Sequence, residues 1–286
     1  MIKRIAFFIM TNLALMVTVS IIAMILGINP RSNDLISITI YSGIFGFMSA
    51  FMSLALSRVS AKWMTGAKVI TNPSNQTEAW LVKTVEQLIL NTNIKKMPEV
   101  AIYHADDVNA FATGPTKNRS LVAVSTGLLN NMNESEVRAV LAHEIAHIEN
   151  GDMVTMTLIM GVVNTVVLIV SRLLTNLIAS QFKIESSVLT GFIYIAIQIV
   201  IGIFSNLIVM YFSRKREYRA DAGAARLVGN NDMINALVAI ERSIGKDKEV
   251  ETNKNLATLS ISSNNSDSLW STHPTIENRI NALRNI

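Results

Sequence analysis

Four long apolar runs limit what this chain of 286 residues can fold into. They carry no charged residue and contain 19 to 24 residues each: 5–28, 35–57, 153–171 and 189–212. A helix needs about 20 apolar residues to cross the hydrocarbon core of a bilayer, and uncharged runs this long are rare in soluble domains. The sequence therefore predicts a mainly α membrane protein with four transmembrane helices.

Short polar turns pair these runs into two hairpins, residues 1–57 and 153–212. Asn29–Asp34 separates the first two runs, and Gln181–Ser187 is the outer turn between the last two. The first run is too long for the core of a signal peptide and no small-residue cleavage site follows it, so we expect it to be retained.

The distribution of Lys and Arg predicts the orientation. The two loops on the opposite side carry Arg31 and Lys183, with Arg172 near the far end of the third run, where it is most easily a snorkelling anchor and alternatively a buried functional Arg. By the positive-inside rule, the soluble parts and both termini face the cytoplasm. The cationic residues that share this predicted cytoplasmic side are Lys3, Arg4, Arg58, Lys62, Arg214, Lys215, Arg216 and Arg219.

Two mixed, charged segments, 58–152 and 213–286, form the predicted cytoplasmic domain. The first segment predicts a helix at 77–91 and a small sheet from short strands at 99–103, 109–113 and 121–125, with Gly114-Pro115 between the last two. The second segment predicts a helix through 236–242, a mobile polar loop at 245–272 and a short final helix at 278–283.

Composition excludes several kinds of function. The chain has no Cys, so any metal must take His or carboxylate ligands. The net charge of +4 comes without interleaved basic and aromatic residues, which predicts no nucleic-acid partner.

Residues 143–147 read His-Glu-Ile-Ala-His inside a predicted helix, Glu134–Asn150, whose start is marked by the capping-box spacing of Asn133 and Glu136. In a helix the two His side chains lie one turn apart on one face and can bind one zinc ion. Glu144 projects from the flank, where its carboxylate can hold and deprotonate a water bound to the metal. A chance occurrence is the alternative, because five residues are a short pattern.

A catalytic zinc takes three protein ligands, so His143 and His147 need a third donor. The last two runs leave the membrane surface and return to it, and Glu217 is the first carboxylate after the return. We therefore expect Glu217 to be the third metal ligand. Asp221, four residues later, would face the same way in a helix and accept the N–H of a ligand imidazole. The alternative is that both acids pair with neighbouring Arg and Lys residues at the membrane surface.

Two further groups fit roles in peptide hydrolysis. His273, followed by the rigid Pro274, is a candidate donor to the oxyanion of the transition state, with Arg279 as a second positive group; a His-Pro pair is otherwise a common loop feature. His104 is interpreted as structural. The strand residues Asn109, Ala110, Phe111 and Ala112 form a candidate edge for an extended peptide substrate, and an ordinary core strand is an equally good interpretation.

Taken together, these motifs resemble the bacterial HtpX family, heat-shock-associated membrane zinc metallopeptidases related to the CAAX-protease-like gluzincins. The resemblance covers nearly the whole chain, with its motifs in the same order. They are 109–114 (Asn-Ala-Phe-Ala-Thr-Gly), 122–129, 143–147 with 150–152 (Asn-Gly-Asp), 213–223, and His273-Pro274 with Arg279-Ile280.

The resemblance implies a gluzincin-like cytoplasmic domain on four membrane helices in the bacterial inner or plasma membrane. It implies one zinc on His143, His147 and Glu217, catalysis by Glu144, and an orienting role for Asp221, with His273 and Arg279 near the transition state. The implied substrates are misfolded or damaged membrane proteins. Two alternatives are a CAAX-type processing peptidase with a narrow substrate range and a non-catalytic membrane scaffold that binds zinc.

Overall fold

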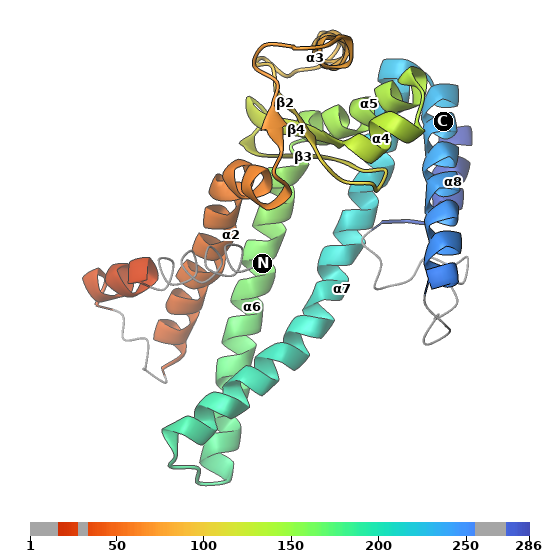
Figure 1. Ribbon diagram of the computed structural model, residues 1–286. Helices are drawn as coiled ribbons and strands as arrows, with labels where there is room; N and C mark the ends of the chain where they lie inside the picture. The colour runs from red at the N-terminus through yellow and green to blue at the C-terminus, as the bar shows by residue number, and fades with distance from the viewer. Residues whose placement is uncertain (1–16, 28–33, 255–272) are drawn as a thin grey trace. The chain divides into compact units, whose positions relative to one another are not determined.

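The computed structural model describes residues 17–27, 34–254 and 273–286 (Figure 1). The chain divides into two compact units. One comprises Met1–Ala55 and Val154–Tyr211, and the other comprises Leu56–Met153 and Phe212–Ile286. Each unit is therefore built from two separated stretches of sequence.

Three helices in the described part of the chain are long and apolar enough to span a membrane: α2 (Leu35–Thr65), α6 (Asp152–Gln181) and α7 (Ser187–Val228). Residues 17–25 are also helical, but most of the first predicted run, 5–28, lies outside the described residues. Three candidate spans are thus observed, and the fourth stays a prediction.

These helices run past the predicted spans. No Gly or Pro occurs between Arg172 and Gln181, so α6 continues ten residues beyond the predicted end at 171. Arg172 is consequently an interior residue of the helix and not close to its end. Helix α7 continues through Glu217 and Asp221. These two acids are therefore one helical turn apart on the same helix, as the sequence predicted.

Close packing of α2 on α6 depends on small residues. A Cβ on Gly161 would lie 2.7 Å from the ring of Phe47, and a Cβ on Gly46 would lie 2.8 Å from the backbone nitrogen of Thr165. In a bilayer, where no hydrophobic effect drives helices together, such close contact is a main source of stability.

The second unit, Leu56–Met153 with Phe212–Ile286, contains a four-stranded sheet in the order β1-β2-β4-β3. The strands are β1 (Lys68–Val69), β2 (Glu99–Tyr103), β3 (Ala110–Thr116) and β4 (Arg119–Ser125). Strands β2 and β4 are parallel, and the other pairs are antiparallel. β1 was not predicted, because two residues show no periodicity. β3 does not end at Gly114-Pro115 as predicted; it passes through them with a register shift, a bulge that an edge strand tolerates.

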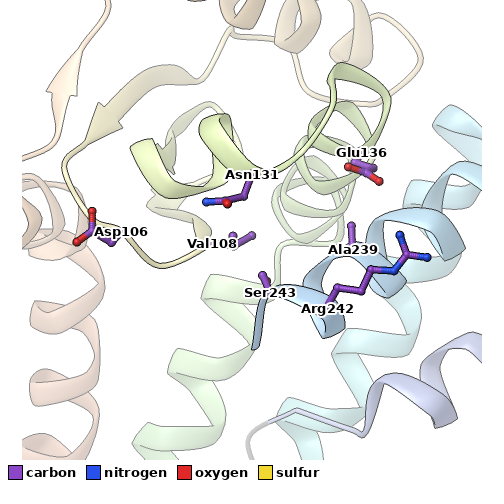
Figure 2. Close-up of a pocket in the computed structure, with 7 residues that line it drawn as sticks. All are labelled: Asp106, Val108, Asn131, Glu136, Ala239, Arg242 and Ser243. Atoms are coloured by element: carbon purple, nitrogen blue, oxygen red, sulfur yellow. The ribbon is translucent and has the colours of Figure 1, made fainter. Parts of the chain in front are cut away.

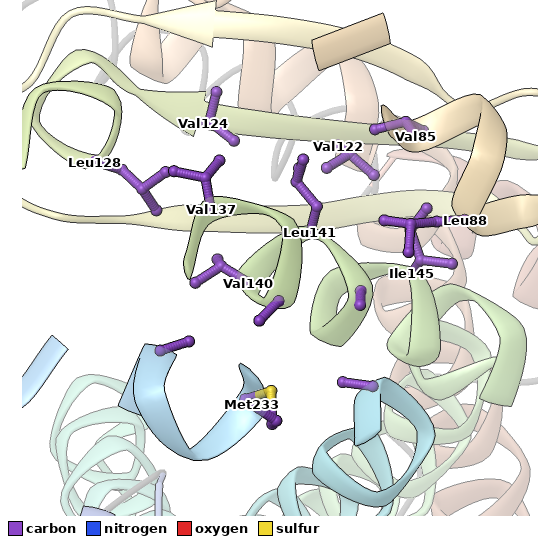
Figure 3. Close-up of a cluster of buried hydrophobic side chains, with 14 of the residues drawn as sticks. Val85, Leu88, Val122, Val124, Leu128, Val137, Val140, Leu141, Ile145 and Met233 are labelled. Carbon is purple, nitrogen blue, oxygen red and sulfur yellow. The ribbon is translucent and has the colours of Figure 1, made fainter. Parts of the chain in front are cut away.

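Helices α3 (Gln76–Ile89), α4 (Thr126–Asn131), α5 (Glu134–Asn150), α8 (Asn230–Lys254) and α9 (Ile276–Arg284) complete this unit. Figure 3 shows Val137 and Leu141 of α5 pointing towards Val122 and Val124 of β4, while Met233 of α8 lies on the other side of α5. Helix α5 is therefore buried on both sides, which fixes its orientation in the core.

The predicted loop at 245–272 is wrong in its first part, because α8 extends to Lys254. Residues 246–251 read Lys-Asp-Lys-Glu-Val-Glu, and Lys and Glu are strong helix formers. Residues 255–272 lie outside the described part.

Candidate metal centre

Helix α5 supplies the two imidazoles. The predicted capping box is confirmed: the Asn133 side chain accepts from the backbone N–H of Glu136, and the Glu136 carboxylate accepts from the backbone N–H of Asn133. This fixes where the helix starts and hence which residues face the core. His143 and His147 are both buried, and their Nε2 atoms lie 3.1 Å apart.

Glu217 enters the same site from α7. Its side chain is 1% exposed, with Oε2 at 3.4 Å from His143 Nε2 and Oε1 at 3.4 Å from His147 Nε2. Ligands at about 2.0–2.1 Å from a tetrahedral zinc lie roughly 3.3 Å from one another. The three ligand atoms, all within 4.8 Å of one another, fit that arrangement.

The electrostatics of this cluster also fit a cation. Glu217 Oε1 is buried and has no hydrogen-bond partner among the described residues, although Arg216 Nε lies within ion-pair distance at 3.5 Å. A buried carboxylate oxygen without a partner costs free energy unless a charge satisfies it. A divalent metal at the shared point of the three ligand atoms would do so, and two imidazole nitrogens with one carboxylate are a donor set that zinc accepts.

Asp221 holds the outer nitrogen of the first ligand. Its Oδ1 lies 2.9 Å from His143 Nδ1, and Arg279 donates to both of its oxygens at 2.6 and 2.8 Å. With Nδ1–H donating to Asp221, the lone pair of His143 Nε2 points to the metal position. The sequence pattern predicted that Asp221 and Arg279 lie at the site, and the roles of these two residues in catalysis stay predictions.

Asp152 holds the second ligand, a role that the sequence analysis missed. Its Oδ2 lies 2.6 Å from His147 Nδ1, and its Oδ1 accepts from Arg219 at 2.6 Å. Gly151, at φ 70°, ends α5 in the left-handed conformation and turns the chain so that Asp152 reaches back. The signal was the Gly-Asp pair directly after the metal helix.

The remaining predicted residues lie as follows. His273 is 59% exposed, and its Nδ1 lies 3.0 Å from Glu217 Oε2. Glu144 is half-buried, and its charge acts on both His147 and Arg279. His104 is exposed after β2 and is not part of the metal cluster found in the described residues.

A close helix contact brings the ligands together. A Cβ on Gly223 of α7 would lie 2.7 Å from the Cβ of Ala146, which lies between the two His on α5. Glycine at 223 therefore allows α7 to come close enough for Glu217 to reach both imidazoles.

Neighbouring carboxylates make the two imidazoles basic. Burial lowers the pKa of His147, but the contacts with Asp152 and Glu217 outweigh it and raise the pKa to about 9. Burial opposes the charged form of His143 too, and Asp221 and Glu217 nevertheless raise its pKa. A metal must compete with these protons, so binding releases them.

A cavity of about 210 Å³ lies elsewhere in the same unit, between α4, α5 and α8 (Figure 2). Figure 2 shows Val108, two residues before β3, together with Ala239 and Ser243 of α8. The cavity is also lined by Asp106, Asn131, Glu136 and Arg242.

Zincin-type metallopeptidases have a characteristic site. It consists of two His one turn apart on a helix, a Glu directly after the first His, and a third metal ligand from elsewhere in the chain; this structure has the same arrangement, with the carboxylate of Glu217 as the third candidate ligand. The comparisons with known proteins agree. Residues 75–286 match Peptidase family M48, and the chain belongs to that family. It is a membrane-integral metallopeptidase.

Similar proteins cover the full chain. A Protease HtpX homolog of Neisseria meningitidis serogroup C is 48% identical over 99% of this chain and 100% of the relative. One from Chlorobium limicola is 49% identical over 98% of each. The crystal structure of S. mikatae Ste24p has the same fold, with a TM-score of 0.62 at 18% identity over 99% of this chain and 66% of that one.

Replacing Gly223 tests the helix contact. Gly223→Val should push α7 away from α5, and we expect bound metal to fall at least about tenfold, measured by elemental analysis of the purified protein. Gly202→Val is the matched control, because a Cβ at Gly202 of the same helix meets nothing within 4 Å. Equal metal content in both variants would contradict the role of the contact.

The pKa of His147 predicts a pH dependence of metal-free stability. Its pKa in the folded state, about 9, exceeds the ordinary 6.5, so this stabilisation is complete below pH 6.5 and is lost as pH rises to 9. The free energy of unfolding of EDTA-treated protein should therefore fall across this window, by up to about 3 kcal/mol. Asp152→Asn should flatten the decrease, and an unchanged slope in that variant would contradict the assignment.

Proposed function

We propose that this protein is a zinc-dependent endopeptidase that holds one zinc ion per chain on His143, His147 and Glu217. The observation that carries the proposal is the position of Glu217: a buried carboxylate 3.4 Å from both imidazole nitrogens, with one oxygen lacking a hydrogen-bond partner. Peptidase family M48 membership supports it.

When bound, zinc supplies a Lewis acid that polarises the scissile carbonyl and lowers the pKa of water. Glu144 takes the proton of the attacking water and passes it to the leaving amine. Asp221 and Asp152 hold the two imidazoles in the tautomer that leaves both Nε2 lone pairs on the metal side. His273, more than half exposed beside Glu217, donates to the oxyanion as the carbonyl becomes tetrahedral. Arg279, bound to Asp221, adds positive charge behind His143.

The substrate binds as an added strand. β3 is an edge strand of the sheet and contains Ala110, Phe111 and Ala112, with Asn109 just before it. Extended backbone can pair with the outer edge of such a strand through main-chain hydrogen bonds, which select for unfolded polypeptide and not for a particular sequence. β3 also packs on α5, the helix that carries the His pair.

The membrane arrangement that we propose has four spans, with the peptidase unit and both termini in the cytoplasm of a bacterial cell and the spans in its inner membrane. The charge distribution supports it. The substrates are misfolded or damaged membrane proteins, which makes the protein part of stress-responsive quality control. The relatives named Protease HtpX homolog support proteolysis, and the substrate class is the one that the resemblance to the HtpX family implies. A processing peptidase of CAAX type is the second candidate.

Glu144→Gln separates catalysis from metal binding. Because Glu144 is not a ligand, the variant should keep about one zinc per chain and lose at least a hundredfold in cleavage of casein or an unfolded membrane protein, as removal of a general base does. Glu134→Gln, at an exposed position of the same helix, is the matched control and should keep full activity. Undiminished cleavage by Glu144→Gln would exclude this mechanism. Cleavage of prenylated peptides alone by the wild type would favour the CAAX alternative.

Glu217→Gln tests the third ligand. Loss of the negative oxygen should weaken zinc binding at least about tenfold, measured with a competing chelator. Glu241→Gln, an exposed acid of α8, serves as the control. Wild-type zinc affinity in Glu217→Gln would move the third ligand to another residue.

A further inference from the structure

The membrane unit contains a cavity with a cationic lining. It has a volume of about 370 Å³ and is lined by residues of α2, α6 and α7, the three long apolar helices of Figure 1. Its polar residues come from all three helices: Tyr41, Ser42, Arg172, Tyr194 and Gln198. Neither peptidase chemistry nor helix packing requires such a set between apolar spans.

Arg172 is the charged residue of this lining. It is partly buried, and no ion pair among the described residues includes it. The stretches of sequence that form this unit contain two acids, Asp34 and Glu185, and neither lines the cavity. A guanidinium presents a fork of N–H donors that can bind an anion. The cavity therefore has a positive charge that is not matched by the protein.

The neighbouring hydroxyls are arranged to donate. Gln198 Nε2 donates to the Tyr194 hydroxyl at 3.2 Å, so the proton of that hydroxyl is available for another acceptor. The charge of Arg172 acts electrostatically on the same hydroxyl. A guanidinium fork beside hydroxyl donors matches an oxyanion with several acceptor oxygens, such as phosphate.

The rest of the lining is apolar. Ile38, Phe45 and Leu168 complete the cavity. A ligand here needs hydrocarbon as well as an anionic group. A water-soluble anion would contact the polar residues and leave the apolar side chains of the cavity without a partner.

The depth of the cavity agrees with such a ligand. Arg172 lies twenty residues beyond Asp152, the first residue of α6, which is about 30 Å of helix. The hydrocarbon core of a bilayer is also about 30 Å thick. With one membrane surface near the start of α6, as the charge pattern predicts, Arg172 reaches the depth of the opposite headgroups.

We propose that this cavity binds a membrane phospholipid, with the phosphate on Arg172 and the hydroxyl of Tyr194 and an acyl chain against Ile38, Phe45 and Leu168. The site is independent of the metal centre, and its loss leaves the zinc ligands untouched.

The test measures lipid binding by native mass spectrometry of the full-length protein in detergent, titrated with dioleoyl phosphatidylglycerol. Arg172→Gln should weaken binding at least about tenfold, because it removes charge-assisted hydrogen bonds. Lys183→Gln, which removes a cation of the α6–α7 turn outside the cavity, is the matched control and should bind as the wild type does. Tyr194→Phe, which deletes one hydroxyl, should weaken binding roughly threefold and serves if Arg172→Gln does not fold.

Three probes separate the possible sources of the ligand. Dioleoylglycerol, which has the same chains without phosphate, should bind at least about tenfold more weakly than phosphatidylglycerol. Inorganic phosphate at millimolar concentration should not displace the lipid, and neither should a peptide with a free C-terminal carboxylate. Equal binding of dioleoylglycerol, displacement by phosphate or peptide, or unchanged affinity in both cavity variants would overturn the proposal.

Discussion

The buried carboxylate of Glu217 between two imidazole nitrogens is the constraint on which the peptidase unit depends. Three ligand atoms of the same polarity face one point, and this is stable only when a cation or protons lie between them. The neighbouring structural features position Glu217 and the two His side chains for this contact. The capping box sets the start of α5, Gly223 admits α7, and Gly151 turns Asp152 back to His147. The metal centre is therefore a product of helix ends and helix contacts, and not of a flexible loop.

The parts of this site that the sequence predicted are those governed by local spacing. An i, i+4 pair on one helix face follows from helix geometry alone, and so does the common face of Glu217 and Asp221. The order of the membrane runs added one long-range inference, that Glu217 returns beside the metal helix. The predicted strands at 99–103 and 121–125 are likewise found because alternation and β-branched residues mark them.

The missed parts depend on tertiary contacts or on weak local signals. Asp152 and Arg219 are 67 residues apart, and nothing in either local sequence indicates their ion pair. β1 pairs with β2 over only two residues, and its existence depends on the partner strand. Arg172 looked like a helix-end anchor because the apolar run ended there, whereas helix propensity alone carried α6 further. Hydropathy marks where a chain is apolar; it does not mark where a helix ends.

Charge balance explains why the same pocket can accept either protons or a metal. Three acids contact the two His: Glu217, Asp221 and Asp152. Each acid also has a guanidinium group within ion-pair distance, Arg216, Arg279 and Arg219 respectively. The carboxylates in direct contact with the imidazoles nevertheless attract protons to them, as the raised pKa values of both His show. A divalent cation that displaces two imidazolium protons leaves the net charge of the pocket unchanged, so the surrounding ion pairs need no rearrangement. The outer ring of Asp and Arg residues thus holds the ligands in place in both states, and exchange of metal for protons is controlled by pH and metal concentration.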